Sequence, residues 1–181
     1  MTEDWRKALD KKQVVGVVFI DFKKAFDSVS HALLLKKLKS LGIAGDLWWW
    51  IKDYLNDRKM VTIVQGAKSS CHDVRYGVPQ GSVICSILFS LFCNDLPDII
   101  QDEEVDIEMF ADDTTIYAIG QNPDIVANTL NNILKKLSSW CLKNSLTAHL
   151  GKTEYMLLGC PKFNGPFQEI RFRNATIKRM Y

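Results

Sequence analysis

Residues 14–20 are Val-Val-Gly-Val-Val-Phe-Ile, and the chain turns polar at once with Asp21. A continuous run made up mostly of β-branched residues is typical of a strand that is buried on both faces of a sheet. An ionised carboxylate at the end of such a strand is costly unless a positive group lies beside it. The stretch therefore predicts a central strand and makes Asp21 a functional candidate, although a cap at the strand end is the simpler role.

Two amphipathic helices are predicted after this strand. Ser30 is a suitable N-cap for the first, which we expect to end near Gly42. The second follows Asp46 and carries apolar residues at helical spacing. These residues are Leu47, Trp50, Ile51, Tyr54 and Leu55.

The middle of the chain predicts a strand pair and a buried helix. The pair covers residues 59–64 and 71–76, around a turn at Gln65-Gly66. A loop rich in helix breakers, residues 77–81, follows it. The apolar stretch at 82–96 is then long enough to be a buried helix.

The last third of the chain predicts strands on either side of one long helix. Segments 105–110 and 114–119 are strand-like and flank a hairpin turn at Ala111-Asp112-Asp113. Asn122-Pro123 is an N-cap with proline at the first helical position. A further strand at 153–158 and a last hairpin at 170–177 complete the order. We therefore expect an α+β fold with a mainly antiparallel sheet and helices packed on one face.

Composition limits the classes of protein that the chain can belong to. Its 181 residues and 20.7 kDa suit one domain, and 47% hydrophobic with 24% charged residues is ordinary for a globular protein. The 23 Lys and Arg against 21 Asp and Glu give a net charge of only +2. This near-neutrality does not support a histone-like protein that binds nucleic acid by bulk charge, so a nucleic-acid role would have to come from a local arrangement of charges.

Cysteine usage and the chain's hydropathy bear on its location. The five cysteines, at 71, 85, 93, 141 and 160, include no pair at the spacing of zinc or redox motifs, and we expect them to be reduced. The start of the chain is unlike a signal peptide. The longest apolar segment, 83–93, is too short for a membrane span. An intracellular protein of the cytoplasm, the nucleus or both is predicted, without membrane contact.

Asp112-Asp113 is the second functional candidate, because two adjacent carboxylates between apolar strands call for a cation. If their strand neighbours the strand before Asp21, the three carboxylates form a hard-oxygen site suited to Mg²⁺ and phosphates. Asp112-Asp113 alone more often forms a solvated hairpin tip. A receiver domain or a haloacid-dehalogenase-like phosphatase also places an aspartate at a strand end, but both expect alternating parallel βα units.

Seven blocks of sequence are spread over most of residues 14–158: FIDFKKAFDSVSH at 19–31, YGVPQGS at 76–82, ILF at 87–89, NDLP at 94–97, FADD at 110–113, SLT at 145–147 and KTEYM at 152–156. These blocks resemble the motifs of the reverse transcriptases, and they occur in that family's order. The Phe-Ala-Asp-Asp form of residues 110–113, together with His31 and the Asn-Asp-Leu-Pro of residues 94–97, is most similar to non-LTR (LINE-type) retrotransposons.

The resemblance implies a metal site and assigns its ligands. Asp21 and Asp112 would be the principal ligands of two Mg²⁺ ions, for which Mn²⁺ is a possible substitute, and Asp113 would be the third carboxylate. The carbonyl of Phe22 would touch the metal that holds the triphosphate. Lys152 would lie near the leaving pyrophosphate as its general acid, whereas a lone lysine before a strand is more often a solvated surface residue.

Three further residues would contact the substrate by the same resemblance. The ring of Phe26 would be a steric gate that favours dNTP over rNTP; without the motif it would be a core residue of a helix. Gln80 and Gly81 would lie against the incoming nucleotide and the template base. We interpret Asp27 and His31 as structural residues at the start of a helix.

The resemblance also predicts the organisation and function of the chain. Residues 1–181 would be a single reverse transcriptase domain fragment, a palm with part of the fingers. Residues 1–13 would be an N-terminal lead-in and 159–181 the start of the primer-grip hairpin, with the thumb, the remaining fingers and the endonuclease absent.

The leading hypothesis for function is an RNA-directed DNA polymerase palm that uses an RNA template, a DNA primer and dNTPs. The alternative is an inactive retrotransposon-derived fragment that acts at most as an RNA- or protein-binding module. Much of the catalysis of phosphoryl transfer comes from positioning the primer and the nucleotide. The expected absence of the thumb and of the remaining fingers therefore supports this alternative.

Overall fold

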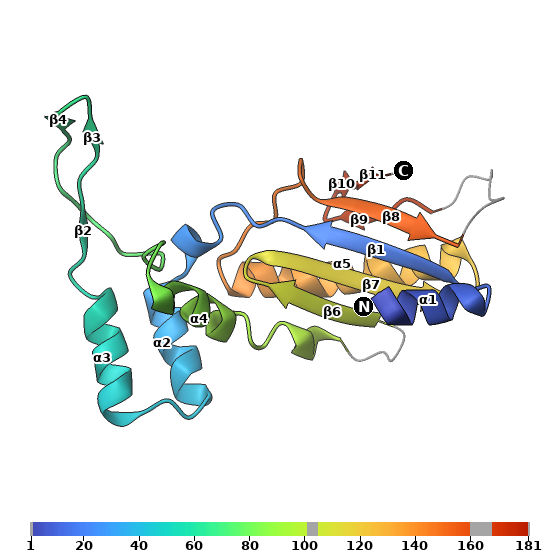
Figure 1. Ribbon diagram of the computed structural model, residues 1–181, viewed down its shortest axis with the longest axis horizontal. Coiled ribbons are helices and arrows are strands. Elements are labelled where there is room, and N and C mark those ends of the chain that lie inside the picture. Colours follow the sequence, from blue (N-terminus) through green and yellow to red (C-terminus); the bar gives the residue numbers. More distant parts are fainter. Residues whose placement is uncertain (1, 101–104, 160–167, 181) are drawn as a thin grey trace. The chain divides into compact units, whose positions relative to one another are not determined.

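The computed structural model describes residues 2–100, 105–159 and 168–180 (Figure 1). The chain forms two compact units: a sheet unit, made of the residues up to Lys23 and from Asp95 onward, and a helical unit, Lys24–Asn94. Cys160 and residues 160–167 of the predicted primer-grip region lie outside the described residues.

A five-stranded, mainly antiparallel sheet is the core of the sheet unit. β1 is its central strand and runs antiparallel to β7 on one side and to β8 on the other, whereas β11 is parallel to β8. The α+β fold with a mainly antiparallel sheet is therefore confirmed. The strands in sheet order are β11 (Lys178–Arg179), β8 (Glu154–Leu158), β1 (Val14–Ile20), β7 (Asp113–Gly120) and β6 (Val105–Phe110).

α5 (Pro123–Lys143) covers one face of this sheet (Figure 1). The Asn122 side chain accepts a hydrogen bond from the Ile125 amide at 2.9 Å, so the predicted N-cap is confirmed. The helix lies so close to β1 that a Cβ at Gly16 would stand 2.8 Å from a methyl group of Leu130. Glycine at that position therefore permits the close approach of helix and strand.

α1 (Thr2–Asp10) lies on the other face of β1, which corrects the expectation that the helices pack on one face. Ala8 packs in one buried cluster with Val15, Val17 and Tyr117, the side chains that alternate with those facing α5. The segment predicted as a lead-in is thus a helix that seals the second face of the central strand.

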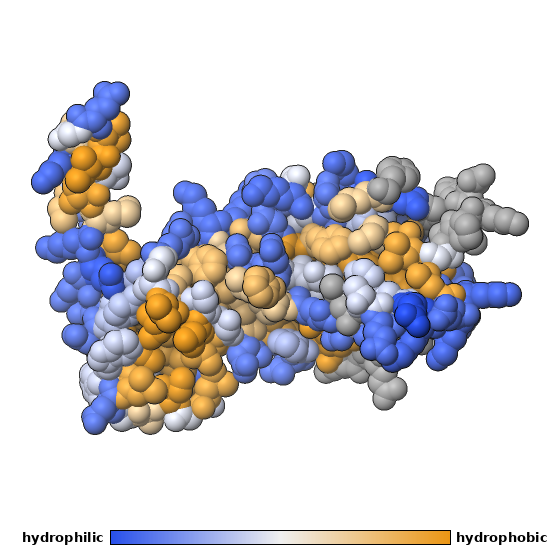
Figure 2. Space-filling model, in the orientation of Figure 1, coloured by the Kyte–Doolittle hydropathy of each residue, from blue (hydrophilic) through white to orange (hydrophobic). Residues whose placement is uncertain are grey.

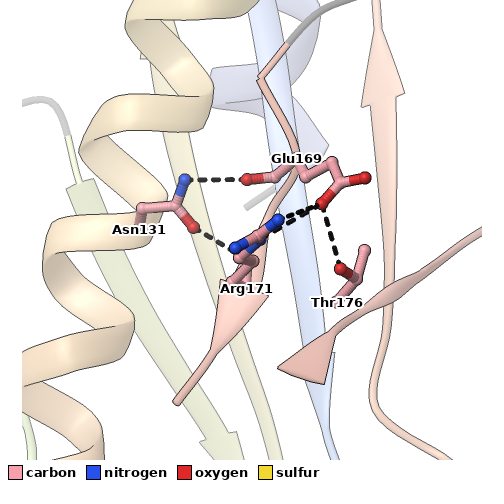
Figure 3. A network of polar contacts seen from close by, with 4 residues as sticks. All are labelled: Asn131, Glu169, Arg171 and Thr176. Atoms are coloured by element: carbon pink, nitrogen blue, oxygen red, sulfur yellow. Dashed lines mark hydrogen bonds and ion pairs between the residues drawn. The ribbon is translucent and has the colours of Figure 1, made fainter. Parts of the chain in front are cut away.

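A two-stranded hairpin, β9 (Arg171–Phe172) and β10 (Ala175–Thr176), docks on α5 (Figure 3). The Asn131 amide group donates to the Glu169 carbonyl at 2.9 Å and accepts from the Arg171 amide at 2.8 Å. The Glu169 carboxylate accepts hydrogen bonds from the side chains of Arg171 and Thr176, and these bonds lower its pKa. The predicted last hairpin is confirmed.

The helical unit contains the elements that lie, in sequence, between the two segments of the sheet unit. Ser30 caps α2 by accepting a hydrogen bond from the Leu33 amide at 3.4 Å, as predicted. Apolar side chains lie at the surface over α2, α3 and α4 (Figure 2), among them Leu41, Leu47 and Ile87. Its elements are the 3₁₀ turn η1 (Phe26–Ser28), α2 (His31–Ser40), α3 (Gly45–Leu55), α4 (Val83–Phe92) and the short strands β2 (Lys59–Met60), β3 (Ile63–Val64), β4 (Ala67–Lys68) and β5 (His72–Asp73).

Two general expectations can be compared with the described residues. The four cysteines among them, at 71, 85, 93 and 141, are not joined to one another by disulfides. In the same part of the chain, no helix has both the length and the apolar character that crossing a bilayer requires. The remaining short element is the 3₁₀ turn η2 (Pro97–Ile99) of the sheet unit.

Candidate active site

Strand register brings the three predicted carboxylates to one end of the sheet. Ile20, the last residue of β1, pairs with Thr114 of β7. Asp21 follows Ile20 and Asp113 precedes Thr114, so continuation of the antiparallel register sets these two residues opposite each other. Asp112 lies in the turn that leads into β7. The strand before Asp21 and the strand that begins at Asp113 are thus neighbours in the sheet, as predicted.

The β6–β7 turn is tight and carries an unusual backbone angle. Phe110 pairs with Asp113, which leaves only Ala111 and Asp112 in the loop, so the predicted hairpin turn is confirmed. Ala111 has φ +55°, in the left-handed region that glycine adopts more readily. A non-glycine residue held there stores strain beside a candidate functional residue.

Lys152 forms an ion pair with Asp21, the first carboxylate of the site. Its Nζ lies 3.4 Å from Asp21 Oδ2, and the side chains of Lys152 and Asp21 are 67% and 27% exposed. Lys152 is therefore within reach of solvent and of the carboxylate group at the same time. A carboxylate at the end of a buried strand is stabilised by a positive group, and for Asp21 this group comes from a residue 131 positions later in the chain.

Backbone hydrogen bonds fix the segment that carries Lys152. The His149 amide donates to the Asp21 carbonyl, and the Lys23 amide donates to the Thr147 carbonyl, both at 2.7 Å. Phe22 is buried between these bonds and forms a bridge with Ala148. His149 contributes its backbone amide to this segment, so the identity of its side chain gives no indication of this role in the sequence.

The carboxylates suit a hard divalent cation by type and by backbone position. Oxygen ligands from aspartate are those that Mg²⁺ prefers, and the ammonium of Lys152 already occupies a cation's place beside Asp21. Within the described part of the chain, no three His, Cys, Asp or Glu side chains converge closely enough to enclose a metal. Side-chain adjustment at Asp21, Asp112 and Asp113 would be needed for shared coordination.

Phe26, Gln80 and Gly81 belong to the helical unit, whereas the carboxylates and Lys152 belong to the sheet unit. The half-buried ring of Phe26 packs on Phe89 of α4, with the ring centroids 4.7 Å apart. Gln80 is exposed and donates from Nε2 to Asp27 Oδ1 at 3.5 Å. Gly81 has φ +85° and open space where a Cβ would lie.

The loop that carries Gln80 is anchored at its beginning. The Gly77 amide donates to the Val29 carbonyl at 2.8 Å, and the Val78 amide donates to the Phe26 carbonyl at 2.9 Å. His31 Nε2 donates to the Gly77 carbonyl at 2.7 Å. His31, interpreted from the sequence as structural, is therefore structural for this loop.

Comparison with known proteins decides the family. The family model described as reverse transcriptase (RNA-dependent DNA polymerase) matches residues 1–177. The chain belongs to the reverse transcriptase family. The motif blocks that led to this expectation lie within the matched range.

Similarity to curated proteins narrows the family assignment from reverse transcriptases in general to those of non-LTR elements. The chain is 33% identical to the RNA-directed DNA polymerase from mobile element jockey of Drosophila funebris, over 81% of the chain and 16% of the relative. It is 32% identical to the probable RNA-directed DNA polymerase from transposon BS of Drosophila melanogaster, over 84% and 17%. The predicted non-LTR reverse transcriptase domain is confirmed, and the chain spans about one sixth of these relatives' length.

Solved structures show the same fold at low sequence identity. Apo telomerase from Candida tropicalis, truncated from its C-terminal domain, superposes with a TM-score of 0.64 and 17% identity over 94% of this chain and 36% of that one. Telomerase of the same organism in complex with a fragment of telomeric RNA also gives 0.64, at 13% identity over 98% and 31%. The reverse transcriptase chain therefore has a palm-type polymerase fold.

Proposed function

We propose that this chain is the palm of an RNA-directed DNA polymerase that adds dNTPs to the 3′-hydroxyl of a DNA primer on an RNA template. The observation that carries the proposal is the β1–β7 register, which brings Asp21 and Asp113 opposite each other next to the Asp112 turn. Two Mg²⁺ ions held there would activate the primer hydroxyl and stabilise the leaving oxygen, and Mn²⁺ could replace them.

The chain's own residues would divide the remaining tasks. Asp21, Asp112 and Asp113 would supply the negative oxygens that hold the ions, and the Phe22 carbonyl would add a further oxygen. Lys152, released from its ion pair with Asp21 when cations are held there, would donate a proton to the departing pyrophosphate. This exchange of partners accounts for a lysine at a carboxylate site.

The helical unit would hold the nucleotide. Packing on Phe89 restricts the Phe26 ring, so the ring can exclude a ribose 2′-hydroxyl without swinging aside. Gln80 and Gly81 would contact the nucleotide and the template base, since Gln80 is exposed and Gly81 leaves room for close approach. We assign the helical unit to part of the fingers. A cytoplasmic or nuclear site of action stays a prediction from the sequence.

Primer extension on an RNA template tests the proposal. The wild-type chain is expected to incorporate dNTPs with Mg²⁺, and Asp112→Asn is expected to fall to background. Asp10→Asn is the matched control, because Asp10 is an exposed aspartate at the end of α1. Equal incorporation by the wild type and Asp112→Asn would overturn the site. No incorporation by any of the three would favour the alternative of an inactive binding module.

Phe26→Ala tests the assignment of the gate separately. Removing the ring is expected to raise incorporation of rNTPs relative to dNTPs, while Leu47→Ala, an exposed apolar change on α3, leaves the ratio unchanged. An unaltered rNTP to dNTP ratio in Phe26→Ala would show that the ring serves only in packing.

A further inference from the structure

A chain of hydrogen bonds connects α3 to the loop that carries Gln80. The Tyr54 hydroxyl donates to Ser82 Oγ at 3.0 Å, and Ser82 Oγ donates in turn to the Pro79 carbonyl at 2.8 Å. Ser82 is the N-cap residue of α4, yet its side chain makes no capping bond to that helix. Its hydroxyl is therefore used to close the loop rather than to cap the helix.

Neighbours along the helix hold the ring of Tyr54 in place. The Trp50 ring stacks on it at 5.7 Å and 15°, one helical turn earlier. The Arg58 guanidinium lies 4.8 Å from the Tyr54 ring centroid and donates to the Tyr54 carbonyl at 3.0 Å. The hydroxyl is thus directed at Ser82 by a ring with little freedom to turn, so this bond costs little side-chain entropy.

The loop needs such a support at its second half. Gly77 and Val78 are bonded to the backbone of residues 26–29, but Gln80 is exposed and its bond to Asp27 is long, at 3.5 Å. Gly81 adopts φ +85° with open space around it, a conformation that leaves its backbone free of side-chain restraint. The Tyr54–Ser82 bond joins this half of the loop to a helix.

We propose that Tyr54 is a positioning residue of the polymerase, which fixes the loop through Ser82 so that Gln80 and Gly81 meet the nucleotide in one geometry. The assignment rests on the proposed function, because Gln80 and Gly81 are its substrate contacts. Tyr54 itself touches no reacting atom. Gln80 and Gly81 would contact the nucleotide before the reaction as well as during it, and weakening contacts of this kind raises the KM for dNTP while leaving kcat nearly unchanged.

Hydrogen exchange tests the positioning without requiring activity. Tyr54→Phe is expected to speed exchange of the Ser82 amide, which donates to the Pro79 carbonyl at 3.3 Å, by about two- to tenfold, the effect of one lost hydrogen bond. Tyr117→Phe is the matched control, since it removes a tyrosine bond of equal length, 3.0 Å to Asp106, from the other unit. Loop exchange in Tyr54→Phe equal to that of the wild type would overturn the proposal.

A double-mutant cycle with dNTP kinetics tests the consequence. Tyr54→Phe and Ser82→Ala are each expected to raise the KM for dNTP by about two- to tenfold with kcat nearly unchanged, and the pair is expected to do no more than either alone. Additive effects, or a loss in kcat alone, would contradict a shared positioning role. If the wild type extends no primer but Tyr54→Phe still loosens the loop, the proposed function fails and the positioning stands.

Discussion

Gly77→Ala is a sharp test of how the Gln80 loop is built. Gly77 has φ +89°, and a Cβ there would stand 2.9 Å from the Asp27 Cα and 3.0 Å from the Asp27 carbonyl oxygen. Both atoms belong to the backbone, so no side chain can turn aside to relieve the contact. The clash falls where the Gly77 amide bonds to Val29, and the whole loop start would have to move.

Two costs add at this position. A left-handed backbone costs a residue with a Cβ about 1–2 kcal/mol. Forcing an extra methyl group into closely packed surroundings adds about 1–3 kcal/mol. Gly42 supplies the matched control, because it has φ +83° and nothing within 4 Å of its Cβ position. Gly42→Ala should therefore lose about 1–2 kcal/mol of unfolding free energy, and Gly77→Ala about 2–5 kcal/mol.

Urea unfolding, monitored by tryptophan fluorescence, measures the difference in unfolding free energy between the two variants. Trp48, Trp49 and Trp50 all lie on α3, so the signal reports mainly on the helical unit that contains both glycines. The free energies of unfolding of the two variants and the wild type are compared at equal m-values. A Gly77→Ala loss no larger than that of Gly42→Ala would show that Asp27 does not confine the loop.

Three further perturbations have defined outcomes. Ala111→Gly should raise the free energy of unfolding by about 0.5–1 kcal/mol in thermal melts, because glycine relieves the φ of +55°; a destabilised variant would refute the strain. Glu169 has a lowered pKa in the fold, so docking of the β9–β10 hairpin should weaken as pH falls through that pKa; amide exchange at Arg171 should show this, and an unchanged pH dependence in Glu169→Gln would contradict it. Lys152→Met should lower primer extension about 100-fold at an unchanged melting temperature, whereas a drop of less than about threefold would exclude a general acid.

Much of the fold follows from local patterns. The β-branched run predicts β1 because such residues suit a strand covered on both faces, and α1 and α5 do cover it. Asn122-Pro123 predicts the start of α5 because both residues act on the helix end itself. The turn at Asp112 is predicted for a similar reason, since only two residues separate β6 from β7.

The features that the sequence left open depend on contacts between distant residues. α1 is a mostly polar segment in which only Ala8 is fully buried. Its apolar face is therefore too small to predict from the sequence and becomes evident only from its packing on β1. The pairing of Lys152 with Asp21 depends on backbone bonds from His149 and Thr147, which any residue type could make. The contact from Tyr54 to Ser82 joins two helices, and neither side chain indicates its partner.

Mn²⁺ binding tests most directly whether Asp21, Asp112 and Asp113 share one metal site. The ion is added without nucleotide or primer, and its binding is measured as the loss of the electron paramagnetic resonance signal of the free ion. The wild type and Asp10→Asn are expected to bind equally, Asp21→Asn and Asp112→Asn to lose the same fraction of bound ion, and the double variant to lose no more than either. Binding by Asp112→Asn equal to that of the wild type, or losses that add in the double variant, would contradict a shared site.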